Sequence, residues 1–176
     1  CISLTCLNSP LDSDTISGTQ FYIDPTIGGR YCSTSVIGTC ILGLCFGKSV
    51  VKEFLKGAHS LDQNAKEHSF KHNLALIAAW SSIWYRNVAN FSTKVILAYS
   101  YALQLFPNHL QQLLCESNGK AVTRSNTSLD YPTCPIILAS PGTHCQHSFF
   151  QLIHQSQTIT PLEFISIESS DLQNSV

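Results

Sequence analysis

The chain has 176 residues, 44% of them hydrophobic and 12% charged, and its 10 basic and 11 acidic side chains give a net charge of -1. This apolar content is enough to bury a core and excludes a globally disordered chain. The near-neutral charge excludes a nucleic-acid-binding protein built on a basic face. Residue 1 is Cys and Met is absent, so we expect an internal piece of a longer polypeptide.

The first 92 residues predict two short strands followed by three helices. The strands are expected at residues 2–7 and 21–23, and a turn with two adjacent glycines is expected at residues 24–30. Apolar residues at helical spacing predict helices at residues 33–46, 49–66 and 73–87. The first of these helices is apolar with small side chains, so we expect it to be buried.

From residue 94 onward, predicted strands alternate with predicted helices. Apolar runs predict strands at residues 94–99, 135–139 and 162–167. A helix is expected to follow the first strand, to continue past Phe106-Pro107 and to stop at Gly119. A capping-box pattern from Thr143 to Gln146 predicts a helix that reaches about residue 155. Between the helix that stops at Gly119 and the strand at residues 135–139, the polar residues 121–134 predict turns or a hairpin. The alternation predicts the α/β class, with a parallel sheet flanked by helices.

Cysteine usage and apolar runs bear on location. Several of the eight cysteines lie inside apolar runs, so we expect reduced thiols that pack as small hydrophobic side chains. Reduced thiols favour a cytoplasmic location. No C-x-x-C pair occurs, so no structural zinc site is expected. The apolar stretches at residues 36–46 and 74–85 are shorter than the roughly 18 apolar residues that span a membrane, so no membrane contact is expected.

Glu116 is the first candidate for proton chemistry. It lies near the predicted C-terminus of a helix, where the partial negative charge disfavours an ionised carboxylate, as suits a general base. Gln112 lies four residues earlier, so both side chains share one face of the helix. The alternative is an exposed glutamate that pairs with Lys120, four residues later.

His147 is the second candidate. It falls in the first turn of the helix predicted from Thr143, where the helix dipole disfavours the charged imidazolium. We therefore expect a neutral imidazole that can give or take a proton. The alternative is a histidine on a helix face that makes one hydrogen bond.

Arg30 and Cys145 are further candidates. Arg30 follows Gly28-Gly29, whose small size lets the backbone approach a ligand while the guanidinium meets an anion. The alternative for Arg30 is a structural ion pair with Asp24. Cys145 would be a thiolate if the helix N-terminus lowered its pKa. His144 and His147 are close to it in sequence, so a Cys–His nucleophile and a metal site are both open alternatives. The spacing of these residues matches no strong ligand pattern.

Five short strings of residues follow one another along the chain. They are Ile27-Gly28-Gly29-Arg30-Tyr31, Gly57-Ala58-His59 with Asp62-Gln63, Leu110-Gln111-Gln112 with Glu116-Ser117-Asn118-Gly119-Lys120, Pro141-Gly142-Thr143 with Gln146-His147-Ser148-Phe149, and Gln151-Leu152-Ile153-His154-Gln155. Their order and spacing resemble the glucose-6-phosphate isomerase family over roughly residues 3 to 167. The chain departs from the family where it has Leu138-Ala139-Ser140 and His144-Cys145, since the family usually has Trp-Gly-Glu and Asn-Gly there.

The resemblance implies parts of two sugar-isomerase (SIS-type) α/β domains, each a parallel sheet between helices. Residues 1–31 would end the first domain and residues 32–92 would form connecting helices. Residues 93–168 would form the first half of the second domain, and residues 169–176 a polar tail.

The resemblance also implies a function, the interconversion of glucose 6-phosphate and fructose 6-phosphate through a cis-enediol, without metal or cofactor. Glu116 would move the proton between C1 and C2. Arg30 would stabilise the anionic intermediate, and Gln112, Gly29 and Arg30 would bind the sugar phosphate. His147 would assist ring opening from the neighbouring subunit, which implies a homodimer.

The family's phosphate-binding Ser/Thr loop and its catalytic lysine lie outside these residues, so we expect the isolated chain to be inactive and poorly folded, with an open sheet edge and exposed apolar helix faces. Two rival functions stay open. A non-catalytic sugar-phosphate-binding module of the same fold predicts affinity without turnover. A degenerate relic predicts neither.

Overall fold

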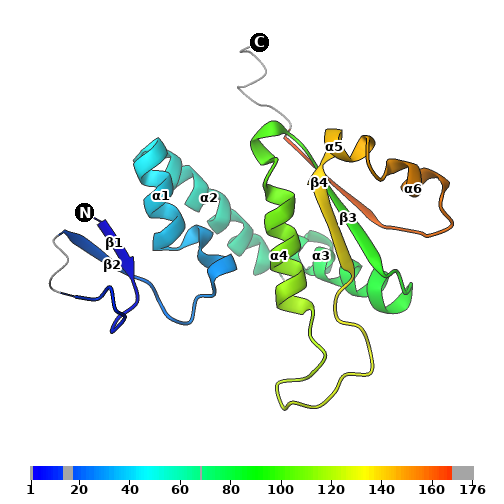
Figure 1. Cartoon of the computed structure of the whole chain (residues 1–176), viewed down its shortest axis with the longest axis horizontal. Coiled ribbons are helices and arrows are strands. Elements are labelled where there is room, and N and C mark those ends of the chain that lie inside the picture. Colours follow the sequence, from blue (N-terminus) through cyan, green and yellow to red (C-terminus); the bar gives the residue numbers. More distant parts are fainter. Residues whose placement is uncertain (1, 14–17, 68, 168–176) are drawn as a thin grey trace, which may run out of the picture. The chain divides into compact units, whose positions relative to one another are not determined.

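The computed structural model describes residues 2–13, 18–67 and 69–167 (Figure 1). The predicted polar tail at residues 169–176 lies outside the described residues. The chain forms two compact units, Cys1–Ala78 and Ala79–Val176. The domain boundaries predicted after residues 31, 92 and 168 concern a longer polypeptide and stay predictions.

The first unit pairs two short strands and then becomes helical. Strands β1 (Ile2–Thr5) and β2 (Thr19–Tyr22) are parallel, as their pairing from Ile2 with Thr19 to Thr5 with Tyr22 shows. The helical elements that follow are the 3-10 helix η1 (Gly29–Thr34), α1 (Val36–Phe46), α2 (Lys48–Ala65), the 3-10 helix η2 (Phe70–His72) and the start of α3 (Leu74–Ile83). All three predicted helices of this region are therefore present.

Helix α1 begins and ends at residues suited to those positions. Ser35 is the N-cap, and its Oγ accepts a hydrogen bond of 3.2 Å from the backbone N–H of Ile37. Gly47 ends the helix with φ +83°, a conformation that side chains with a Cβ rarely adopt.

The expectation that this first helix is buried is wrong for the described residues. Leu44 and Phe46 are 68% and 67% exposed, and Ile41 is 54% exposed. The reason is that the helix is apolar on all sides, so it needs partners all round. Within its unit, η1 and α2 pack against α1 and cover only part of its surface.

The second unit is built on a three-stranded parallel sheet, which confirms the predicted fold class. The strands are β3 (Thr93–Tyr99), β4 (Ile136–Pro141) and β5 (Leu162–Ser166), and their order is β4-β3-β5. The four central residues of β3, from Val95 to Ala98, are at most 2% exposed. A central strand covered on both faces explains why this run is continuously apolar rather than alternating.

Helices cover both faces of this sheet. Helix α4 (Phe106–Asn118) connects β3 to β4, while α5 (Gly142–Gln146) and α6 (Phe150–Gln155) connect β4 to β5. Because such crossovers are right-handed and the two run in opposite directions along the sheet, α4 lies on one face and α5 and α6 on the other (Figure 1). On the second face, Val95 and Leu97 pack with Cys145 of α5.

Two helix predictions need correction. The helix after β3 does not run continuously from the strand. A 3-10 turn η4 (Tyr101–Leu103) comes first, and α4 begins at Phe106, because Pro107 lacks an N–H and fits the first turn of a helix. The helix predicted from residue 143 to residue 155 is two short helices with a break at residues 147–149.

The connection between α4 and β4 is the hairpin-like segment that the polar residues predict. Val122 and Ser128 form an antiparallel bridge, and the N–H of Thr123 donates to the carbonyl of Thr127 at 2.9 Å. Asn126 takes a positive φ of 58° at the turn, which asparagine tolerates. In the described part of the chain, the helices are all too short or too polar to cross a membrane.

Candidate active site

Glu116 and Gln112 lie together on the exposed side of α4, as their spacing predicts. Both residues are exposed, and the Gln112 Nε2 donates to the Glu116 Oε1 at 3.5 Å. The residue before Gln112 anchors the helix on the sheet, since the Gln111 Nε2 donates to the carbonyl of Ile137 in β4 at 2.6 Å. The carboxylate therefore stands on a supported helix and is open to a ligand.

The end of α4 is fixed beside the start of β4. Gly119 caps the helix, and a Cβ there would stand 2.5 Å from the carbonyl oxygen of Cys115, so the turn needs glycine. Directly after it, the N–H of Lys120 donates to Thr133 Oγ1 at 3.1 Å, and this hydroxyl donates to the carbonyl of Lys120 at 2.9 Å. The Lys120 ammonium donates to the backbone carbonyl of Glu116.

His147 lies beyond the other end of β4, and the local structure differs from the expected one. Helix α5 begins at Gly142 directly after Pro141, and no side chain caps it, so Thr143 is not the N-cap. His147 is the exposed C-cap residue of this five-residue helix. The N–H groups of Ser148 and Phe149 both donate to the carbonyl of Cys145, which turns the chain before α6 starts. The helix-dipole argument made for His147 therefore does not hold.

Glu116 and His147 are far apart within one chain. The last turn of α4 lies at the N-terminal end of β4, whereas α5 follows its C-terminal end (Figure 1). At a rise of about 3.3 Å per residue, the six residues of β4 span about 17 Å. The two helices also lie on opposite faces of the sheet. The structure thus brings Gln112 to Glu116 but separates both from His147.

Gly29 and Arg30 belong to the first unit, at the start of η1. A Cβ at Gly29 would meet no atom within 4 Å, so space for a ligand is open beside this backbone. The Arg30 guanidinium lies 5.9 Å from the ring centroid of Tyr31. The Asp24 carboxylate accepts hydrogen bonds from the Thr26 hydroxyl at 2.6 Å and the Thr26 N–H at 2.8 Å, which hold the pKa of Asp24 below its ordinary value.

Comparison with known proteins then tests the resemblance. The family model described as phosphoglucose isomerase matches residues 13–176. The chain belongs to the phosphoglucose isomerase family. This confirms the resemblance inferred from the five strings.

Individual relatives of this family match nearly the whole chain. The glucose-6-phosphate isomerase of Treponema denticola is 45% identical over 171 residues, which are 97% of this chain and 33% of that protein. That of Chlamydia pneumoniae is 41% identical over 169 residues, which are 96% of this chain and 32% of that protein. The chain therefore spans about a third of the length of the curated relatives it matches.

Solved structures agree with the fold. The crystal structure of a glucose-6-phosphate isomerase from Chlamydia trachomatis matches with a TM-score of 0.87 and 39% identity, over 93% of this chain and 32% of that chain. A hypothetical protein, TT0462 from Thermus thermophilus, matches with a TM-score of 0.77 at 22% identity, over 99% of this chain and 42% of that chain, and shows the fold alone.

Cys145, at which this member of the phosphoglucose isomerase family departs from the usual family sequence, packs in the core of the second unit. Cys145 is fully buried, and its thiol donates to the carbonyls of Pro141 at 3.1 Å and Gly142 at 3.2 Å. Burial raises the pKa of the Cys145 thiol, which disfavours the thiolate nucleophile considered from the sequence. Among the described residues, no cluster of three or more His, Cys, Asp or Glu side chains could hold a metal ion.

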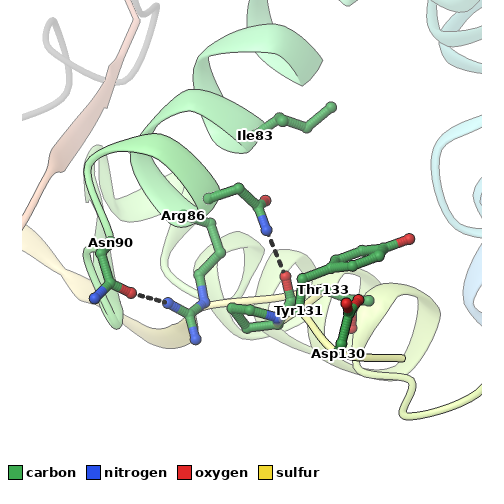
Figure 2. A pocket seen from close by; sticks show the side chains of 8 residues that line it. Ile83, Arg86, Asn90, Asp130, Tyr131 and Thr133 are labelled. Atoms are coloured by element: carbon green, nitrogen blue, oxygen red, sulfur yellow. Dashed lines mark hydrogen bonds between the residues drawn. The ribbon is translucent and has the colours of Figure 1, made fainter. Parts of the chain in front are cut away.

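A pocket of about 540 Å³ lies in the second unit (Figure 2). It lies between the segment that follows α3, the π-helical η3 (Trp84–Val88), and residues 130–133. The Asn87 Nδ2 donates to the carbonyl of Pro132 at 2.8 Å, and the Arg86 Nε donates to that of Cys134 at 3.3 Å. These bonds hold the segment that contacts Lys120, and the predicted site residues do not line the pocket.

The sequence patterns do not single out Tyr99 of the second unit as a candidate functional residue. Tyr99 ends β3, and its hydroxyl accepts a hydrogen bond of 3.3 Å from the Gln146 Nε2. The capping-box pattern instead predicts that Gln146 caps the helix at Thr143. An aromatic residue with a polar tip at the carboxyl end of the central strand was the available signal, since ligands of parallel sheets bind at that edge.

Proposed function

We propose that this chain is part of an aldose–ketose isomerase that interconverts glucose 6-phosphate and fructose 6-phosphate. Membership of the family supports the activity, and the single observation that carries it is the exposed Glu116 carboxylate held beside Gln112 on α4. The names of the relatives supply glucose 6-phosphate, and the family resemblance implies fructose 6-phosphate as its partner in the reaction.

The proposed reaction needs one base and one stabilised anion. After ring opening, the Glu116 carboxylate removes the proton from C2 of the open aldose and returns it to C1, by way of a cis-enediol. The Arg30 guanidinium offsets the negative charge of this intermediate. Gln112 and the backbone at Gly29 bind the sugar phosphate, and His147 transfers the proton that opens the ring. No metal or cofactor takes part in these steps.

We further propose a homodimer in the cytoplasm, with His147 supplied to each site by the neighbouring subunit. A general base and a ring-opening acid must each lie within hydrogen-bond reach, about 2.6 to 3.2 Å, of the same sugar. The span of β4 and the opposite faces of the sheet argue against both groups of one chain serving the same substrate. A second chain removes this difficulty.

The experiment uses the native polypeptide that contains this segment, with its length established by intact mass. Fructose 6-phosphate turnover is followed through a coupled glucose 6-phosphate dehydrogenase assay. We expect Glu116→Gln to lower kcat about 100- to 10,000-fold, the range for loss of a general base. Glu53→Gln, an equal change at an exposed side chain of α2 that pairs with Lys56, serves as the control and should leave turnover unchanged.

Other outcomes point to the rival functions. Glucose 6-phosphate binding by calorimetry without turnover in the unmutated protein would replace the isomerase with a sugar-phosphate-binding module. Neither binding nor turnover would leave a relic. The same assay on residues 1–176 alone should show no turnover.

A further inference from the structure

Tyr99 occupies the space that a side chain at position 142 would need. Gly142 is buried, and a Cβ built on it would stand 2.4 Å from the ring Cζ of Tyr99 and 2.5 and 2.6 Å from the two Cε atoms. Real Cβ atoms essentially never approach so closely. The ring of Tyr99 therefore explains why the Pro141-Gly142-Thr143 string has glycine at its centre.

The same side chain also contacts the other end of α5. The Tyr99 hydroxyl accepts a hydrogen bond from the Gln146 Nε2 at 3.3 Å, and Gln146 directly precedes His147. The centroid of the Tyr99 ring also lies 6.1 Å from that of Phe164 in β5, and the two ring planes are inclined by 34°. One side chain at the carboxyl end of the central strand thus contacts the first and the last residue of α5 and the neighbouring strand.

A helix as short as α5 does not hold its own geometry. It has five residues, far fewer than the roughly 12 to 15 that an isolated helix needs to be even marginally stable. Its position therefore depends on outside contacts. These are the burial of Cys145 against Val95 and Leu97, and the contacts of Gly142 and Gln146 with Tyr99. Of these contacts, the hydrogen bond to Tyr99 reaches Gln146, the residue that directly precedes His147.

We propose that Tyr99 is a positioning residue for His147, acting through Gly142 and Gln146 at the two ends of α5. Its ring sets where the turn leaves β4, and its hydroxyl orients the last residue before the histidine. This inference rests on the proposed function for its catalytic consequence. Its structural part, the placement of the His147 ring by Tyr99, holds independently of the reaction.

The first test removes only the hydroxyl, in the native polypeptide. We expect Tyr99→Phe to lower kcat about three- to ten-fold, the effect of losing one neutral hydrogen bond, while KM for fructose 6-phosphate changes less than about two-fold. Tyr101→Phe is the matched control, because Tyr101 is 81% exposed two residues away, and it should behave like the unmutated protein. Equal kcat values for both variants would overturn the role of the hydroxyl.

The second test addresses the packing of the ring. Gly142→Ala is expected to lower kcat more than Tyr99→Phe does, because its methyl group would collide with the ring. Tyr99→Leu should make room for that methyl group, so the double variant should be more active than Gly142→Ala alone. A double variant no better than Gly142→Ala would overturn the packing role.

A spectroscopic measurement separates this inference from the proposed function. Imidazole resonances of His147, assigned by comparison with a His147→Asn variant, should shift in Tyr99→Phe and not in Tyr101→Phe. If the unmutated protein has no isomerase activity, the proposed function fails, and these resonances alone decide the inference. Unchanged His147 resonances in Tyr99→Phe would refute it.

Discussion

The separation of Glu116 from His147 makes a quantitative prediction about mixed dimers of the native polypeptide. Five steps along β4 at about 3.3 Å each separate the two ends of the strand by about 17 Å. Glu116 lies near one end of β4 and His147 lies beyond the other, on the opposite face of the sheet. If each active site takes Glu116 from one chain and His147 from the other, two different defective chains can complement each other. Glu116→Gln and His147→Ala are each expected to be nearly inactive as homodimers.

A heterodimer of these two variants contains one site with both residues intact and one site with both replaced. We therefore expect about half the wild-type kcat per dimer, since the two interfaces of a two-fold dimer are equivalent. The heterodimer is isolated with two different affinity tags after co-expression and assayed for fructose 6-phosphate turnover. A doubly tagged Glu116→Gln homodimer is the control.

If the pure heterodimer were no more active than the two homodimers, both residues would have to act within one chain. The shared-site reasoning would then be refuted, and so would the separation on which it depends. A native polypeptide that runs as a monomer in light scattering would refute it as well.

Three further results are expected. Leu97→Ala should lower the free energy of unfolding by about 2 to 5 kcal/mol in urea titrations, because Leu97 is fully buried, and a loss below about 1 kcal/mol would contradict its place in the core. Thr26→Ala should raise the pKa of Asp24 in a carboxyl NMR titration, because the hydroxyl hydrogen bond that favours the ionised carboxylate is lost. In the unmutated protein these hydrogen bonds stabilise the folded state at neutral pH, and this stabilisation is lost as the pH falls through the lowered pKa of folded Asp24. Cys45, which is exposed, should react with a thiol reagent well before Cys145, which is buried with a raised pKa, and mass mapping that found Cys145 first would oppose this.

The site was predictable where it depends on neighbours in the sequence. Gln112 and Glu116 are four residues apart on a helix whose stop at Gly119 is evident from composition, so their shared face follows from helical geometry alone. The family could likewise be inferred from five strings whose order and spacing need no structure.

The position of His147 was not predictable in the same way. A capping-box pattern predicts Thr143 as the N-cap, but the N-cap is Pro141, two residues earlier. Two hydrogen bonds to the carbonyl of Cys145 then turn the chain after the helix ends at Gln146. Local propensity is a weak influence on a segment this short, so tertiary contacts override it. The burial expected for α1 is wrong for a related reason, since the burial of a helix depends on which elements pack around it.

The sequence by itself determined the α/β class, the strands of the parallel sheet, the helix that carries Glu116 and the family, because each of these depends on short-range periodicity or on linear spacing. Only the tertiary structure decided which helix covers which face, how far Glu116 lies from His147, and why Gly142 must be glycine. The last of these depends on Tyr99, which is 43 positions from Gly142 and 47 from Gln146. Such contacts arise when parallel strands align their carboxyl ends, and no pattern of neighbouring residues encodes them.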